Sequence, residues 1–152
     1  MNLPKGVFSY NSSIAKFLLG KNYHTIMLFG FVFTKLDTLP SKVRIHEQTH
    51  IAQYQDCIGI GFMFDIIALF TLFAFDVREY WMYSFIVLPF ILFYLIYGLE
   101  WLYFKLIKGL SCKDAYLNIG FERQARHCAS TWDKPCEEQN FYGSFDWWKK
   151  LH

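Results

Sequence analysis

Charged residues are scarce in this sequence, and basic residues do not cluster anywhere in it. Only 18% of the 152 residues are charged, well below the quarter that is usual in a soluble domain. The net charge of +2, with no run of Lys or Arg, argues against a nucleic-acid partner. In contrast, 54% of the residues are apolar and 21% are aromatic. This composition indicates a membrane protein, and the length indicates a single domain, residues 1–152.

The sequence also lacks a secretory signal pattern and any Cys-x-x-Cys pair. In the first 22 residues the longest apolar run is FLLG, so we expect no signal peptide there. The spacing of the cysteines fits neither a zinc ribbon nor a thioredoxin-like motif. A cytoplasmic location would keep these side chains reduced. The four cysteines are Cys57, Cys112, Cys128 and Cys136.

Two long apolar stretches are the clearest structural signal. The first, IGIGFMFDIIALFTLFAF, runs from Ile58 to Phe75 and holds one charged residue. The second covers residues 80–104 and carries aromatic residues at both ends, as membrane-interface belts do. A bilayer core of about 30 Å needs roughly 20 apolar helical residues. We therefore predict transmembrane helices at about 58–75 and 80–104. A pair of buried helices in a soluble core is the alternative, but neither stretch has a polar face.

The distribution of Lys and Arg predicts the orientation in the membrane. Residues 1–57 contain six of them and residues 105–152 contain eight, whereas the connection 76–79 contains only Arg78. The positive-inside rule then predicts a multi-pass protein of the cell inner membrane with both termini in the cytoplasm. We expect the aromatic and basic tail, residues 141–152, to lie at the bilayer interface. The lipid bilayer is thus the expected partner.

The remaining segments predict short strands and further helices. The segment NYHTIMLFGFVFTK, residues 22–35, is rich in β-branched and aromatic residues, which predicts a strand pair or one bent strand with Gly30 at the bend. Ser41 is a candidate N-cap for a helix that begins near Lys42. A cytoplasmic helix is expected at about 113–129. The predicted fold is mainly α, an integral membrane protein with two transmembrane helices, a helix that carries a metal motif and a short hairpin.

That metal motif is RIHEQTH, in which two histidines lie four residues apart. On a helix, His46 and His50 share one face, so their imidazoles can bind one Zn²⁺ ion. Glu47 then lies beside the metal and can take a proton from the zinc-bound water, whose pKa zinc lowers to about 7. The alternative is an exposed helix with two incidental histidines. Further along the helix, Gln53 and Asp56 are candidates to orient the histidines through hydrogen bonds.

A catalytic zinc usually has three protein ligands, and the third must come from further along the chain. Asp65 is an acid within a membrane segment, but a continuous helix would place it about 22 Å from His50. Glu100 lies nearer the cytoplasmic face, yet about two turns of helix below His50, so we expect a packing or supporting role. Glu122 lies on the cytoplasmic helix, which is free to pack across the motif.

Two alternatives to this third ligand remain open. Glu122 could instead be a solvated residue paired with Arg126 at i+4. A separate metal site could form from His127, Cys128 and Cys136, although their spacing fits no usual zinc pattern.

Four segments together resemble a known family. They are LFGFVFTK, HEQTHIAQYQD, FYLIYGLEWLYFKL and AYLNIGFERQAR. Their order is similar to that in small, uncharacterised bacterial HExxH membrane proteins, which are zincin-like metallopeptidases of the glutamate-zincin type. The resemblance covers roughly residues 25–150 and implies that His46, His50 and Glu122 bind zinc and that Glu47 is the catalytic acid and base. Four further residues match family positions of unassigned role, namely Gln53, Glu100, Tyr116 and Asn118.

Two departures from the family pattern affect this interpretation. Residues from about Gly59 to Val87 look like an insertion that adds a membrane pass. A family tyrosine is replaced by Arg126, and the acidic residue before Ala125 is replaced by Gln124. If that tyrosine stabilises an oxyanion in the relatives, Arg126 would have to do so here, which a guanidinium can do. Arg126 is therefore a candidate catalytic residue.

The sequence thus predicts a zinc-dependent membrane metallopeptidase. It would hydrolyse peptide bonds near the cytoplasmic membrane face, with a water activated by Glu47. An extended peptide could bind along the strand region Thr25–Lys35 by β-addition. The alternatives are a non-catalytic zinc-binding membrane protein and a hydrolase of a lipid-linked substrate.

Overall fold

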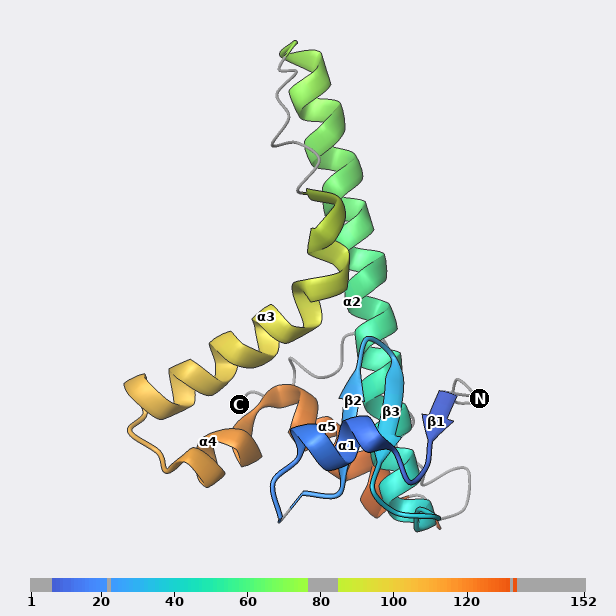
Figure 1. Cartoon of the computed structure of the whole chain (residues 1–152). Coiled ribbons are helices and arrows are strands. Elements are labelled where there is room, and N and C mark those ends of the chain that lie inside the picture. The colour runs from blue at the N-terminus through green and yellow to red at the C-terminus, as the bar shows by residue number, and fades with distance from the viewer. Residues whose placement is uncertain (1–6, 22, 77–84, 132, 134–152) are drawn as a thin grey trace.

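The structure, a computed structural model of the chain, describes residues 7–21, 23–76, 85–131 and 133. It is mainly helical, with a small sheet at the base of a long helix (Figure 1). The predicted tail at 141–152 lies outside the described residues. The elements are β1 (Val7–Ser9), α1 (Ser13–Leu18), β2 (Thr25–Leu28), β3 (Phe31–Thr34), α2 (Ser41–Ala74), α3 (Leu88–Leu102), the π-helical turn η2 (Tyr103–Ile107), α4 (Cys112–Asn118) and α5 (Gly120–Ser130).

The sheet has three strands in the order β1-β3-β2, so that β2 lies at an edge. β2 and β3 pair antiparallel, which confirms the predicted strand pair at Gly30. Phe29 and Gly30 form the turn with φ of 51° and 81°, and hairpin turns of this length favour positive φ. The Phe29 N–H donates to the hydroxyl of Tyr94 at 2.6 Å. This contact ties the tip of the hairpin to α3.

The N-terminal elements β1 and α1 were not predicted from the sequence. β1 has three residues and α1 has six, which is too short for hydrophobic periodicity to reveal them. β1 pairs in parallel with β3 and extends the sheet on the side away from β2.

α2 is a single helix of 34 residues that joins the metal motif to the first apolar stretch. At 1.5 Å per residue it is about 51 Å long, and neither Gly59 nor Gly61 interrupts it. The prediction that Ser41 is the N-cap is wrong by one residue, because Pro40 occupies that position. Pro40 has no N–H, and its ring restricts φ, so it suits the entry to a helix. Beyond Cys57, most large apolar side chains of α2 are exposed.

The second apolar stretch forms α3, which η2 extends to Ile107. The described part of the predicted 80–104 helix is therefore helical from Phe85 onwards. α2 and the run Phe85–Ile107 are both long and apolar enough to cross a membrane. Near the start of α3, Pro89 packs directly against Gly61 of α2.

The prediction of one helix at about 113–129 is wrong, because the segment forms two helices, α4 and α5. Ile119 separates α4 from α5 with an extended backbone, φ −55° and ψ 132°. The side chain of Ile119 is fully buried in the core, so the break inserts an apolar anchor. Ser111 caps α4 by accepting a hydrogen bond from the Asp114 N–H at 3.0 Å.

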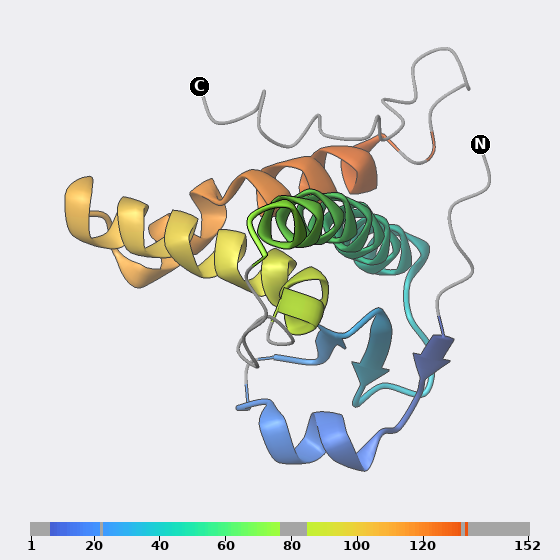
Figure 2. The same ribbon diagram turned by 90° about the horizontal axis from the view of Figure 1, so that it is seen from above.

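The core lies where the sheet, α2, α3 and α5 meet. Its centre joins residues from all four of these parts and from the α4–α5 break. Viewed along α2, α5 lies on one side of that helix and the sheet on another, with α3 extending between them (Figure 2). The buried residues are Met27, Val32, Ile51, Tyr54, Cys57, Phe93, Ile119 and Phe121. This core fixes α5 against the motif turns of α2.

The contact between Gly61 and Pro89 predicts opposite effects for two glycine substitutions in α2. A Cβ at Gly61 would lie 2.4 Å from the Pro89 Cα, whereas a Cβ at Gly59 meets nothing within 4 Å. Gly61→Ala should lower the free energy of unfolding by about 1–3 kcal/mol through overpacking. Gly59→Ala should be neutral or raise it by up to about 1 kcal/mol, because Ala favours a helix. Denaturant unfolding of both variants in detergent checks this, and a stable Gly61→Ala would contradict the packing described.

Candidate metal centre

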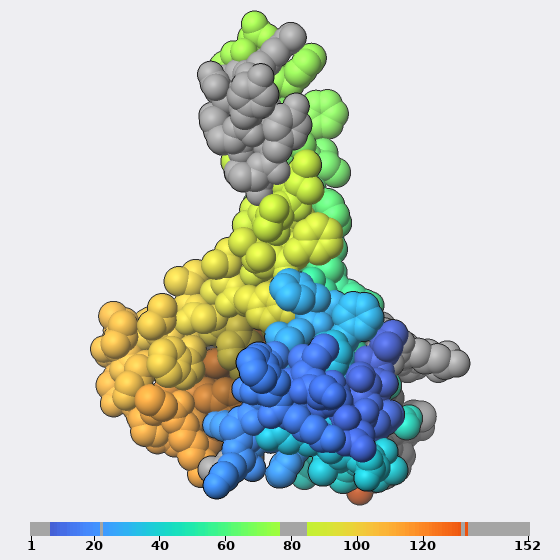
Figure 3. Space-filling model, in the orientation of Figure 1, coloured from blue at the N-terminus to red at the C-terminus, as the bar shows by residue number. Residues whose placement is uncertain are grey.

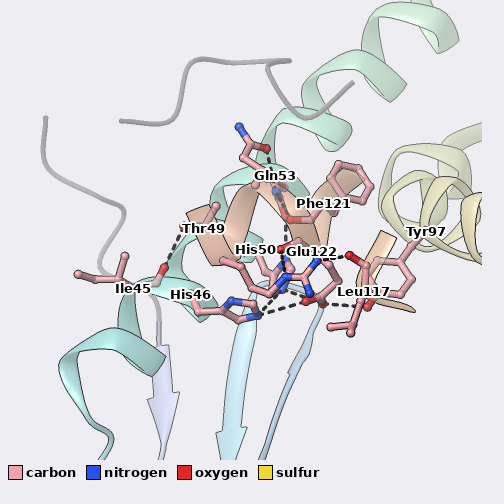
Figure 4. Close-up of polar contacts among 11 residues, drawn as sticks. Ile45, His46, Thr49, His50, Gln53, Tyr97, Leu117, Phe121 and Glu122 are labelled. Carbon is pink, nitrogen blue, oxygen red and sulfur yellow. Dashed lines mark hydrogen bonds and ion pairs between the residues drawn. The ribbon is translucent and has the colours of Figure 1, made fainter. Parts of the chain in front are cut away.

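Three potential metal ligands converge between α2 and α5. His46 and His50 lie one turn apart on α2, and Glu122 lies in the first turn of α5 (Figure 4). Their ligand atoms all lie within 4.8 Å of one another. The Glu122 carboxylate oxygens lie 3.5 Å from His46 Nε2 and 3.2 Å from His50 Nε2, and the two Nε2 atoms are 3.1 Å apart. The three predicted ligands therefore form a group that could hold a metal ion.

The carboxylate of Glu122 is suited to an ionised, metal-binding state. Its side chain is buried, and burial alone would raise its pKa. The interactions with His46 and His50 outweigh burial, so that the pKa of Glu122 is lowered. Within the described part of the chain, its Oε2 atom is buried without a hydrogen-bond partner. Its ion-pair contact is His46 Nε2 at 3.5 Å. Buried oxygens without a hydrogen bond are rare in proteins, and a cation between the three side chains would satisfy this one.

Gln53 fixes which ring nitrogen of His50 is free for a metal. Its Nε2 atom donates to the carbonyl oxygen of Phe121 at 3.1 Å and to Oε1 of Gln124 at 2.9 Å. A carbonyl can only accept, so the Gln53 Oε1 atom must be the one that faces His50. Oε1 then accepts a hydrogen bond from His50 Nδ1 at 2.8 Å. In the neutral ring, Nε2 of His50 therefore carries the lone pair, and this atom points toward Glu122.

Glu47 is a buried carboxyl group in the same cavity as the three ligands. Burial raises its pKa, and the charge of Glu122 adds to this effect, while His50 and His46 partly oppose it. A carboxyl group with a raised pKa can accept and release a proton nearer to neutral pH. For His50, burial lowers the pKa, but the interactions with Glu122 and Glu47 raise it overall.

The cavity beside the ligands has a volume of about 380 Å³. Every residue of β2 lines it, and aromatic residues of α3 form the opposite wall. The face of the molecule in Figure 3 shows α3 above and the N-terminal elements below. The lining residues are Leu19, Tyr23, Thr25, Ile26, Met27, Leu28, His46, Glu47, His50, Phe93, Tyr94, Tyr97, Tyr116 and Glu122. The cavity is therefore largely apolar, and its carboxyl and imidazole groups are those of His46, Glu47, His50 and Glu122.

Besides Gln53, two of the predicted supporting residues contact the site or hold it in place. Tyr116 lines the cavity, and its pKa is raised by burial and by the nearby charge of Glu122. The carboxylate of Glu100 accepts a hydrogen bond from the Gly120 N–H at 2.7 Å. This bond caps the N-terminus of α5, where an acidic group is favourable. Glu100 thus sets the position of Glu122 two residues further on.

The other predicted residues lie away from the ligands. Asn118 donates to the carbonyl of Asp114 within α4. Asp56 lies on α2 six residues beyond His50, which places it on a different face of the helix. Asp65 lies further along the same unbroken helix, about 22 Å from His50.

Arg126 does not line the cavity. Its guanidinium donates to the main-chain carbonyl oxygens of Glu122 and Leu117. The expected i+4 contact with Glu122 therefore involves the main chain of that residue. The side chain of Arg126 braces the junction between α4 and α5.

Sequence reasoning missed Tyr97 and the structural role of Gln124. The Tyr97 hydroxyl donates to Glu122 Oε1 at 2.9 Å, and Gln124 holds Gln53. Both contacts join residues far apart in the chain, so no local pattern could reveal them. The available signals were the place of Tyr97 in the segment FYLIYGLEWLYFKL, which resembles the family pattern, and the polarity of Gln124 beside the apolar residues Phe121 and Ala125.

The role of Gln53 predicts a loss of metal affinity on substitution. Gln53→Met keeps the approximate size of the side chain but removes the acceptor that orients His50. The affinity for Zn²⁺ should fall about 10- to 100-fold, as for other hydrogen-bond partners of metal-binding histidines. Gln55→Met, at an exposed position on the same helix, is the matched control. Competition with a chelating dye measures both, and equal affinities in the two variants would contradict this role.

No family model, curated protein or solved structure matches the chain. The resemblance to HExxH membrane proteins therefore rests on the order of the four segments and stays a prediction.

Proposed function

We propose that this protein is a zinc-dependent membrane metallopeptidase that acts near the cytoplasmic membrane face. The observation that carries the proposal is the convergence of His46, His50 and Glu122 in one cavity with Glu47. Two imidazoles and one carboxylate are the donor set of many catalytic zinc sites, which keep a fourth position open. Zinc bound there would lower the pKa of a coordinated water to about 7.

Glu47 would then serve as the proton carrier. Its raised pKa favours a carboxyl group that takes a proton from water and passes it to the leaving amine. The phenol of Tyr116 lines the cavity and would be a hydrogen-bond donor for the carbonyl oxygen of a substrate, whereas the single hydroxyl proton of Tyr97 is already donated to Glu122. Because Arg126 is bound to the main chain, we assign this role to Tyr116 in place of Arg126.

The edge strand β2 supports a peptide as the substrate. β3 pairs with one side of β2, and all four residues of β2 line the cavity. An extended peptide can add to a free strand edge through main-chain hydrogen bonds. The apolar walls of the cavity favour a substrate with a large apolar side chain near the cleaved bond.

A lipid-linked substrate is the second candidate. Phe93, Tyr94 and Tyr97 of the apolar helix α3 form one wall of the cavity, which favours a substrate that approaches from the membrane. Purified protein in liposomes, assayed on peptide and on lipid ester or amide substrates, distinguishes the two candidates.

Replacing Glu47 separates catalysis from metal binding. In Glu47→Gln, turnover should fall about 100- to 10,000-fold, because the proton carrier is lost. The zinc content should be unchanged, because the three ligands remain. Hydrolysis assays and metal analysis of the same preparations measure both quantities.

Two outcomes would contradict the proposal. Full activity in Glu47→Gln would exclude Glu47 as the proton carrier. One zinc per chain without turnover of any tested substrate in the wild type would instead support a non-catalytic zinc-binding membrane protein.

A further inference from the structure

The later turns of α3 leave α2 and contact α4 and the start of α5. Near its start α3 lies beside α2, where the rings of Phe90 and Phe62 are 5.9 Å apart. Further on, its partners are α4 and the first turn of α5, where the Gly120 N–H donates to Glu100. Figure 1 shows α3 turning away from the axis of α2, and Figure 2 shows it extending sideways when viewed along that axis. The helix therefore has two parts with different neighbours.

The outer face of the second part is a continuous apolar stripe. Its members are spaced four, three and four residues apart, as on one face of a helix. All of them are exposed, whereas the opposite face packs into the core through Phe93 and Trp101. The high overall hydropathy of α3 thus has two sources, the core on one side and an uncovered stripe on the other. The stripe consists of Leu95, Leu99, Leu102 and Leu106.

The neighbours of this second part carry exposed or partly exposed charged side chains. α4 carries exposed Lys113 and Asp114, and α5 carries partly exposed Arg123. α4 and α5 both contact the stretch of α3 that a membrane crossing would place in hydrocarbon. Charged groups in hydrocarbon are strongly disfavoured unless they face a protein partner or a wet cavity. These charges argue against a crossing by residues 95–107.

We propose that residues 95–107 lie in the plane of the membrane, at the boundary between headgroups and acyl chains. The leucine stripe faces the lipid, and α4, α5 and the metal centre lie on the aqueous side. The occupant of the stripe is therefore the bilayer surface, and the exposed apolar side chains of α2 beyond Cys57 face the same bilayer. Lys108, exposed just beyond the segment, suits the anionic headgroups at that depth, whereas the Lys105 ammonium donates to the carbonyl oxygen of Leu110.

This arrangement replaces the crossing expected at 80–104 and does not depend on the proposed reaction. Of the described residues, the apolar part of α2 and the first turns of α3 enter the hydrocarbon, and the motif turns of α2 and residues 95–107 stay on one face. The inner face of the in-plane segment carries Tyr97 and Glu100, which hold Glu122 and Gly120. The segment of α3 that contacts the membrane surface is thus the same segment that positions the third ligand, Glu122.

Depth measurements on two matched pairs of positions test the proposal. Leu95 and Leu102 on α3 are each 44% exposed, and Phe62 and Leu69 on α2 are 43% and 38% exposed. Each pair is separated by seven residues, about 10 Å along a helix axis. A nitroxide is attached at each position through p-acetylphenylalanine, one label per chain, in phosphatidylcholine–phosphatidylglycerol liposomes. Its depth follows from its accessibility to oxygen and to a nickel chelate.

The α2 pair should differ in depth by about 10 Å, and the α3 pair should lie at one depth to within about 3 Å, two residues of helical rise. If a label at Leu95 or Leu102 prevents folding, Leu99 and Leu106 form a substitute pair with the same separation. A depth difference in α3 equal to that in α2 would show that α3 crosses the membrane and would overturn the proposal. Full accessibility of the α3 labels to the nickel chelate would overturn it as well.

Discussion

The buried amide of Gln53 is the contact on which the metal centre depends. One side of the amide orients the ring of His50, and the other side holds the backbone of Phe121, the residue before Glu122. The side chain of Gln53 thus determines which ring nitrogen of His50 faces the metal site, and it also positions Glu122. Glu100 restrains α5 from the opposite side through Gly120. The three ligand atoms converge because α5 is held at two points near its N-terminus.

The unbroken course of α2 couples this site to the membrane. The turns that carry His46 and His50 continue directly into the apolar, outward-facing half of the helix. The depth of α2 in a bilayer would therefore fix the height of the ligands above it. The hairpin tip at Phe29, bound to Tyr94 of α3, brings the edge strand β2 to the same level. The cavity is consequently built between a sheet and an apolar helix.

The sequence predicted those features that local patterns encode. The i, i+4 spacing of His46 and His50 and the β-rich segment around Gly30 revealed the motif helix and the hairpin, because these depend on neighbouring residues. The break at Ile119 was missed, since it depends on a core pocket that forms only when α3 and α5 pack. The binding of Arg126 to main-chain carbonyls and the bond from Tyr97 to Glu122 are likewise set by tertiary packing. Glu122 was identified through a resemblance of motifs, and the geometry that brings it to the histidines came from the fold.

The central claim is that His46, His50 and Glu122 together bind one metal ion. Mass-spectrometric metal analysis of protein purified with added zinc tests it most directly, on wild type, on Glu122→Ala and on Asp37→Ala, which removes an exposed acid away from the site. One zinc per chain is expected in wild type and in Asp37→Ala, with a clear loss in Glu122→Ala. Wild-type protein without zinc, or Glu122→Ala that retains a full equivalent, would contradict the three-ligand site.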